Sequence, residues 1–244
     1  MTRRPPIVVL FDIDGTLLWS DGAGRRAIHN ALIEVFGATG PEGHRFDGKT
    51  DPQIVRELMR HVGHGDDHID AQMERLFAIY ASRLPHELRD PEHPPRLMPG
   101  VTALLDALES RDDVLLGLLT GNIPDGAAAK LRAVGIAPER FKVAAYGSDH
   151  ERRPELPAIA QRRARELTGE DIPGDHMVVI GDTPADVTCG ASLGARSIGV
   201  ATGRYTTAEL ASYGAAAVFD DLSDTPEVLR AILSPGARAS RNGA

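Results

Sequence analysis

The chain has 244 residues, 42% apolar and 25% charged, which is the composition of an ordinary globular protein with room for one large domain or two small ones. Its formal net charge of −8 disfavours binding to nucleic acid or to an anionic membrane surface. No apolar run approaches the roughly 20 residues of a membrane span, and the single cysteine, Cys189, allows no internal disulfide, so we expect a cytoplasmic protein.

The first predicted element is a strand at Ile7–Phe11, an apolar run typical of a strand that is buried on both faces of a sheet. Asp12 and Asp14 follow it at once. Two carboxylates this close together at the end of a buried strand are unfavourable unless a cation or a proton compensates their charge. We therefore expect a positive charge at this position.

Residues 19–96 carry helical patterns and no strand-like run. Asp51-Pro52 is expected to form the N-cap and first turn of the second helix in this region. The glycine-rich segment 15–24 and the proline-rich segment 85–99 are expected to act as hinges, because neither suits a continuous helix. The sequence thus predicts an α-helical cap at 19–96, a core of residues 1–18 and 97–233, and a disordered tail at 234–244.

Beyond the predicted cap, strand-like runs alternate with helical patterns. The runs are Val114–Leu119, Phe141–Tyr146, Met177–Ile180, Ser197–Val200 and Ala216–Phe219. Together with the first strand, this alternation predicts an α/β fold, a Rossmann-like parallel sheet with helices on both faces.

Polar residues follow four of these strands, and ligands of open α/β sheets bind at the carboxyl ends of the strands. They are the aspartates after the first strand, Thr120-Gly121-Asn122, the arginines Arg152 and Arg153, and Gly181-Asp182-Thr183-Pro184-Ala185-Asp186. Carboxylates, a hydroxyl, backbone N–H groups and an arginine at one edge of the sheet suit a hard cation together with a phosphate.

These motifs resemble those of the haloacid dehalogenase-like (HAD) hydrolase superfamily, in its phosphoglycolate phosphatase-like capped subgroup. Asp12–Leu17 matches the first motif, Leu119–Asn122 the second and Gly181–Val187 the fourth. The third motif usually has a lysine, whereas this chain has Arg153 before Pro154, with Arg152 as the alternative. The resemblance spans nearly the whole chain and includes a helical cap inserted after the first motif.

The resemblance also implies a role for each motif. Asp12 would be the nucleophile that forms an aspartyl-phosphate, and Asp14 the general acid and base. Magnesium would be held by Asp12, Asp14 and Asp182, with Asp14 contributing its backbone carbonyl. The remaining implied site residues are Thr120, Gly121, Asn122 and Arg153 for phosphate, Asp186 in support, and Lys49 of the cap for the substrate.

Each of these assignments has a simpler alternative. Asp186 and Asn122 are also suited to capping the helices that follow them, and Lys49 is equally compatible with a solvated loop. The negative charges of Asp12, Asp14, Asp182 and Asp186 exceed the positive charges of one magnesium ion and one arginine by one. We therefore expect Asp14 to carry a proton in the site when no substrate is bound.

The leading interpretation is a magnesium-dependent phosphatase that acts on a small phosphorylated metabolite, because a cap of this size encloses the site and would exclude a folded protein. Asp14 disfavours a dehalogenase or a phosphonatase, neither of which needs a second aspartate in the first motif. A sugar phosphomutase and a non-catalytic binding or regulatory protein stay as alternatives. The sequence does not identify the substrate or the oligomeric state.

Overall fold

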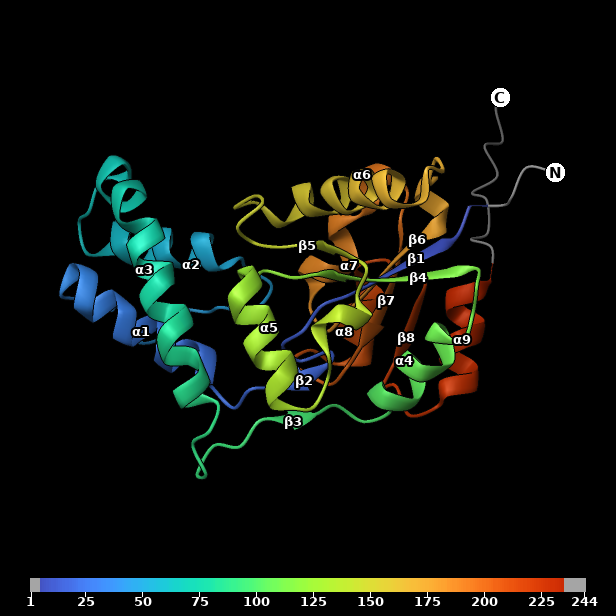
Figure 1. Cartoon of the computed structure of the whole chain (residues 1–244), viewed down its shortest axis with the longest axis horizontal. Helices are drawn as coiled ribbons and strands as arrows, with labels where there is room; N and C mark the ends of the chain where they lie inside the picture. Colours follow the sequence, from blue (N-terminus) through green and yellow to red (C-terminus); the bar gives the residue numbers. More distant parts are fainter. Residues whose placement is uncertain (1–4, 235–244) are drawn as a thin grey trace.

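The computed structural model describes residues 5–234 and contains a six-stranded parallel sheet with the strand order β5-β4-β1-β6-β7-β8 (Figure 1). The central strand β1 pairs with β4 on one side and with β6 on the other, so that Phe11 lies beside Leu118 and Ile180. The residues that follow these three strands therefore meet at one edge. The strands are β1 (Ile7–Phe11), β4 (Val114–Leu119), β5 (Val143–Ala145), β6 (Met177–Gly181), β7 (Arg196–Val200) and β8 (Ala217–Phe219).

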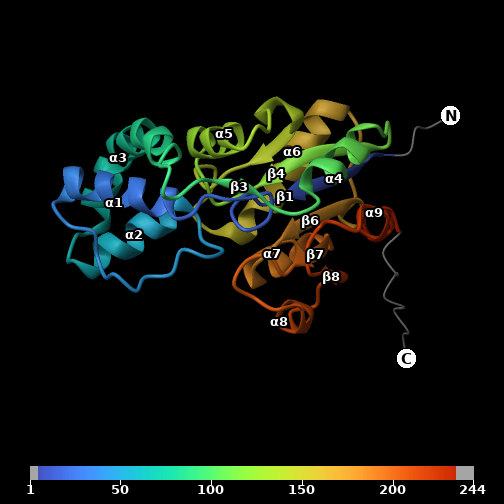
Figure 2. The ribbon, with the colours of Figure 1, turned by 90° about the horizontal axis from the view of Figure 1, so that it is seen from below.

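Helices cover both faces of the sheet, because successive side chains of a strand point to opposite sides. Val9 and Phe11 of β1 belong to the apolar cluster that contains α4 (Val101–Glu109), α5 (Pro124–Ala133) and α9 (Thr225–Leu233). Val8 and Leu10 belong to the cluster that contains α6 (Leu156–Thr168) and Cys189 of α7 (Pro184–Cys189), while α8 (Thr207–Ser212) packs beside β7 and β8 (Figure 2). The predicted Rossmann-like α/β fold is confirmed.

Three further helices, α1 (Ala23–Phe36), α2 (Asp51–His61) and α3 (Asp66–Glu87), lie beyond the carboxyl ends of β1 and β4 (Figure 1). They share an apolar cluster of their own that also takes in Ile123, next to α5. The two segments that connect them to the sheet pair as short antiparallel strands, β2 (Leu18–Trp19) and β3 (Arg96–Leu97). This pairing supports our proposal that a cap domain is divided from the core at residues 19 and 96.

The helices differ from the sequence-based expectation in two places. Helix α3 continues through Pro85 to Glu87, so the proline-rich connection starts later than predicted. Leu84 and Leu88 are buried there, and their burial outweighs the hydrogen bond that a proline removes. Helix α2 is capped by Thr50 rather than by Asp51, because the Thr50 hydroxyl accepts the hydrogen bond from the Gln53 N–H.

The predicted tail, apart from Ser234, lies outside the described residues. Within residues 5–234, none of the helices has the length and apolar character needed to cross a membrane.

Candidate active site

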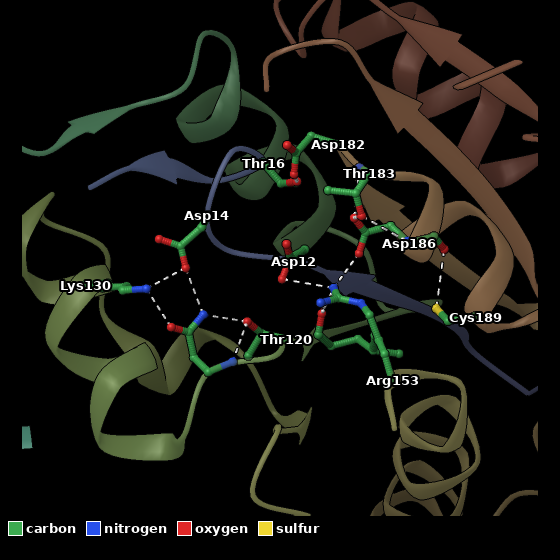
Figure 3. A network of polar contacts seen from close by, with 12 residues as sticks. Asp12, Asp14, Thr16, Thr120, Lys130, Arg153, Asp182, Thr183, Asp186 and Cys189 are labelled. Atoms are coloured by element: carbon green, nitrogen blue, oxygen red, sulfur yellow. Dashed lines mark hydrogen bonds and ion pairs between the residues drawn. The ribbon is translucent and has the colours of Figure 1, made fainter. Parts of the chain in front are cut away.

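Asp12 and Arg153 form the centre of the site, at the carboxyl end of β1 (Figure 3). The backbone N–H of Asp12 donates to the Ile180 carbonyl, which continues the pairing with β6 and holds the residue at the strand end. Arg153 Nη2 lies 3.1 Å from Asp12 Oδ1 and also pairs with Asp186. The positive charge expected beside the first motif is therefore supplied in part by Arg153, the arginine chosen from the sequence.

Asp186 holds this arginine in place and also starts α7. Its Oδ2 accepts hydrogen bonds from the Thr183 N–H (3.0 Å) and hydroxyl (2.6 Å), and the Thr183 hydroxyl in turn accepts from the Asp186 N–H. Asp186 thus completes a capping box and an ion pair at once. The supporting role and the capping role considered from the sequence are both present.

Asp182, which directly follows β6, is held differently. It is 5% exposed, and the Thr16 hydroxyl donates to its Oδ1 at 3.2 Å. No lysine, arginine or histidine of residues 5–234 comes within 4 Å of its carboxylate. Burial, together with the charges of Asp186 and Asp12, raises its pKa well above the usual value, so Asp182 is a buried acid that lacks a cation.

Oxygens of Asp12, Asp182 and Asp186 lie within 4.8 Å of one another, which fits a small hard cation. Because both Asp186 oxygens are already engaged by Thr183 and Arg153, Asp12 and Asp182 are the freer donors. The Asp14 side chain is not part of this group, so among the residues predicted to hold metal, Asp14 can contribute only its backbone carbonyl.

The Asp14 carboxylate instead turns towards α5, away from Asp12 (Figure 3). Its Oδ2 accepts a hydrogen bond at 2.6 Å from Lys130 Nζ and one at 2.9 Å from Asn122 Nδ2, and its Oδ1 accepts one at 3.0 Å from Ser20. Lys130 Nζ also donates to Asn122 Oδ1 at 2.6 Å. The lysine side chain is only 5% exposed, so a buried cation faces the second aspartate of the first motif.

The pKa values of the two aspartates of the first motif are shifted in opposite directions. Burial raises the pKa of Asp12 to about 6, although the charge of Arg153 opposes the rise. Burial acts on Asp14 in the same sense, but the charge and hydrogen bond of Lys130, with Asn122 and Ser20, lower its pKa below the usual value. The expectation that Asp14 carries a proton in the empty site is therefore wrong. The charge count behind it omitted Lys130.

The second motif contributes buried polar groups around this network. The Thr120 hydroxyl accepts hydrogen bonds from the Asn122 N–H (3.3 Å) and Nδ2 (2.7 Å). Asn122 does not cap α5, because the N-cap is Ile123 and its N–H donates to Asp51 at 2.9 Å. Thr120, Gly121 and Asn122 all line the same cavity as Asp12, as the predicted phosphate-binding role requires.

The loop before α2 is pressed onto the core at Gly121 and Gly147. A Cβ on Gly121 would lie 2.0 Å from the Lys49 carbonyl oxygen, and one on Gly147 would lie 2.9 Å from Thr50 Cβ. The Asp51 N–H donates to the Gly121 carbonyl at 2.7 Å, and the Thr50 hydroxyl donates to the Glu151 carbonyl at 2.7 Å. This close approach requires glycine at positions 121 and 147. As a result, the loop before α2 covers the strand ends.

The result is a cavity of about 530 Å³ between the sheet edge and the three cap helices. Asp12, Asp14, Asp182 and Arg153 line it on the core side, and Lys49 lines it on the cap side. Lys49 is paired there with Glu57, which also lies 2.9 Å from His44 Nε2. The proposed substrate contact of Lys49 thus has the right location, but its charge is already compensated.

Sequence reasoning missed two functional candidates, Lys130 and Asp51. Both are buried at the junction of α5 with the cap helices. Lys130 could have been found from the sequence, because it falls on the same face of α5 as Gly126, Ala127 and Leu131. A solvated lysine is not expected on the apolar face of a helix.

Comparison with known proteins agrees with this geometry. The model of the haloacid dehalogenase-like hydrolase family matches residues 8–194, so the chain belongs to that family. It is 32% identical to a phosphoglycolate phosphatase from Rhodospirillum rubrum over 223 residues, which are 89% of this chain and 88% of the relative. The predicted membership of the phosphoglycolate phosphatase-like group, and with it the phosphatase class, is confirmed.

Solved structures show the same fold. A hydrolase from Pseudomonas syringae, 25% identical, has a TM-score of 0.68 and covers 93% of this chain and 100% of its own. CbbY from Rhodobacter sphaeroides, solved in complex with phosphate, is 23% identical with a TM-score of 0.61 over 90% of this chain and 96% of its own.

Proposed function

We propose that the chain is a magnesium-dependent phosphatase that hydrolyses a small phosphomonoester through an aspartyl-phosphate on Asp12. The observation that supports this proposal most is the pairing of Asp12 with Arg153 beside Asp182, a buried acid without a cation, in the cavity between the sheet edge and the cap helices. A nucleophilic carboxylate, a fixed guanidinium and an uncompensated carboxylate next to one another suit phosphoryl transfer, which needs mainly positioning and charge neutralisation.

In this proposal Asp12 attacks phosphorus, and Arg153 binds a phosphate oxygen while it keeps the Asp12 carboxylate oriented. Thr120 and the backbone around Gly121 bind further phosphate oxygens. Magnesium, held by Asp12, Asp182 and the Asp14 carbonyl, would neutralise charge on the transferring group. Asp186 acts on Arg153 and α7 rather than on the substrate.

Asp14 serves as general acid only after it takes up a proton and leaves Lys130. A bound phosphomonoester supplies the reason, because its negative charge beside Asp12 favours the protonated, neutral form of a neighbouring carboxyl. Asp14 would then turn towards the leaving oxygen and protonate it, and afterwards it would accept a proton from the water that hydrolyses the aspartyl-phosphate.

Phosphoglycolate is the first substrate to test, because the relative from Rhodospirillum rubrum is a phosphoglycolate phosphatase. Closure of the Lys49–Asp51 loop onto the core supports a small substrate rather than a macromolecule. A cytoplasmic location remains a prediction.

The test is phosphate release from 2-phosphoglycolate and from an aryl phosphate, with magnesium and after treatment with EDTA. We expect steady turnover that EDTA abolishes and magnesium restores. Asp12→Asn should abolish turnover while its far-ultraviolet circular dichroism stays that of the wild type. Turnover in metal-free buffer, or an active Asp12→Asn, would refute the mechanism. Binding of 2-phosphoglycolate without any release of phosphate would favour a non-catalytic binding protein.

A further inference from the structure

We propose that residues 202–205, in the core loop that follows β7, form a clasp between the metal site and the cap. The clasp positions Asp182 and fastens the loop before α2 at Arg45 and Asp47, so that magnesium binding and cap closure favour each other. This inference rests on the proposed function, in which Asp182 is a magnesium ligand.

The first half of the clasp lies against the Asp182 carboxylate. A Cβ on Gly203 would stand 1.8 Å from Asp182 Oδ2, and a Cβ on Gly15, in the loop after β1, would stand 2.4 Å from the same oxygen. Neither position therefore accepts a side chain while Asp182 stays in place. The Thr202 hydroxyl donates a hydrogen bond to the Gly15 carbonyl and joins the two glycine segments. Together these segments confine the carboxylate.

The second half of the clasp contacts the loop before α2. Arg45 Nη2 donates a hydrogen bond of 3.0 Å to the Tyr205 hydroxyl, and its guanidinium carbon stands 5.7 Å from the centre of the Tyr205 ring. Asp47 Oδ2 lies 3.0 Å from Arg45 Nε of its own loop and 3.8 Å from Arg204 Nε of the core. The cap is thus attached to the core next to the residue that confines Asp182.

This arrangement connects cap closure to the metal site. If the cap moves away, Arg204 and Tyr205 lose their partners, and the clasp is held from the core side only. The position of Gly203 is then less well defined, and metal binding has to supply more of the ordering of Asp182. Linkage makes the effect reciprocal, because a metal that fixes Asp182 favours the closed cap by the same factor.

The two halves of the clasp should differ in strength. The side chains of Arg45 and Arg204 are 52% and 68% exposed, and ion pairs at such exposure contribute little. The contact of Gly203 with Asp182 is different, because Asp182 is buried and an added methyl group would displace its carboxylate. Replacing residues that orient a metal ligand commonly changes metal affinity by about 10- to 100-fold.

The test measures the apparent dissociation constant for magnesium, taken from the rise in melting temperature with magnesium chloride. Gly203→Ala should raise this constant by about 10- to 100-fold. Tyr205→Phe removes only the hydroxyl that Arg45 contacts and leaves the metal site itself unaltered. It should raise the constant by about two- to fivefold, which is the cost of one exposed contact.

Each change has a matched control. An added Cβ on Gly43 would meet no atom within 4 Å, and Tyr213 is 52% exposed at the end of α8. Gly43→Ala and Tyr213→Phe should therefore leave the magnesium constant unchanged. If Gly203→Ala only lowers the metal-free melting temperature and keeps the wild-type constant, the clasp does not position Asp182. An unchanged constant in Tyr205→Phe overturns the coupling to the cap.

Hydrogen exchange of residues 44–49 measures the reciprocal effect. Magnesium should slow exchange of this segment in the wild type, and it should slow it less in Tyr205→Phe. Exchange that does not respond to bound magnesium in the wild type overturns the coupling.

If the wild type binds no magnesium, the metal-dependent part of the proposed function fails, and exchange of the metal-free proteins decides on the clasp. Residues 44–49 should then exchange faster in Tyr205→Phe than in the wild type and in Tyr213→Phe. Equal rates in the three proteins would show that the clasp does not fasten the cap.

Discussion

Lys130 Nζ lies 2.6 Å from Asp14 Oδ2, across 116 residues of sequence. The contact joins α5 to the loop after β1, and it holds the Asp14 carboxylate away from Asp12 (Figure 3). Because the lysine is almost fully buried, this ion pair sets both the direction and the charge of the second aspartate of the first motif. In the proposed mechanism it is the resting arrangement, which substrate binding has to release.

Replacing Lys130 by methionine should therefore act on Asp14. Without the lysine the pKa of Asp14 rises, so the alkaline limb of the kcat/KM profile, where the general acid loses its proton, should move to higher pH. The free energy of unfolding should fall by about 1–2 kcal/mol, less than the 3–5 kcal/mol of a fully buried pair, because 38% of the Asp14 side chain is exposed. Lys142→Met, on the surface, is the control and should change neither quantity appreciably. An unshifted profile would show that Lys130 does not govern Asp14.

In metal-free buffer, replacing Asp182 should stabilise the protein, whereas replacing Asp186 should destabilise it. Asp182→Asn removes a buried charge without a cation, so its melting temperature should rise. Asp186→Ala breaks the ion pair with Arg153 and the capping box of α7, and should cost about 3–5 kcal/mol. Magnesium should raise the melting temperature of the wild type but not that of Asp182→Asn. The reverse order of stabilities would contradict the assignment of Asp182 as the metal ligand.

Arg153→Ala should lower kcat/KM by roughly 10- to 200-fold, since hydrogen bonds to charged groups contribute roughly 1.5–3 kcal/mol. Arg153→Lys should recover part of the loss, because lysine keeps the charge but not the planar fork. Arg152 is the matched control, and with its side chain 73% exposed Arg152→Ala should cost little. Measuring kcat/KM of the three variants on one phosphomonoester decides between the two arginines. An unchanged kcat/KM for Arg153→Ala would show that Arg153 does not bind the phosphate.

Asp51 should make stability depend on pH. Burial raises its pKa to about 6 in the folded protein, against 3.8 for an ordinary aspartate. A raised pKa means that the folded state binds the proton more tightly, so the stabilisation is present below about pH 4 and is lost as the pH rises through about 6. Asp51→Asn removes this dependence and keeps an acceptor for the Ile123 N–H.

Urea unfolding at pH 4 and pH 7 measures the effect. The unfolding free energy of Asp51→Asn relative to wild type should increase by about 1–3 kcal/mol between the two pH values. The exposed Asp67→Asn is the control and should differ from wild type by less than about 0.5 kcal/mol at both. A pH-independent difference for Asp51→Asn would mean that Asp51 is not protonated in the folded protein at low pH.

Much of the core fold and the core-side motif residues were predictable because they depend on local patterns. The apolar run of β1 and the polar residues after β1, β4 and β6 are visible in the sequence, and parallel pairing brings those strand ends to one edge. Arg153 could be preferred over Arg152 on its position before Pro154, and the structure buries Arg153 beside Asp12. The prediction that the proline-rich connection begins at residue 85 was wrong. Helix α3 continues to Glu87, because Leu84 and Leu88 bury their side chains around Pro85.

The sequence by itself determined which segments form strands and helices, and which carboxylates follow the strands, since alternation and spacing reflect how each short segment divides its side chains between core and water. Only the tertiary structure decided which lysine and arginine side chains pair with these carboxylates and which of them line the cavity. Lys130 reaches Asp14, Lys49 is neutralised by Glu57, and Arg153 is shared between Asp12 and Asp186. The physical reason is that ion pairs depend on distances of a few ångströms between residues far apart in the chain, and packing of the cap helices against α5 and the sheet edge sets those distances.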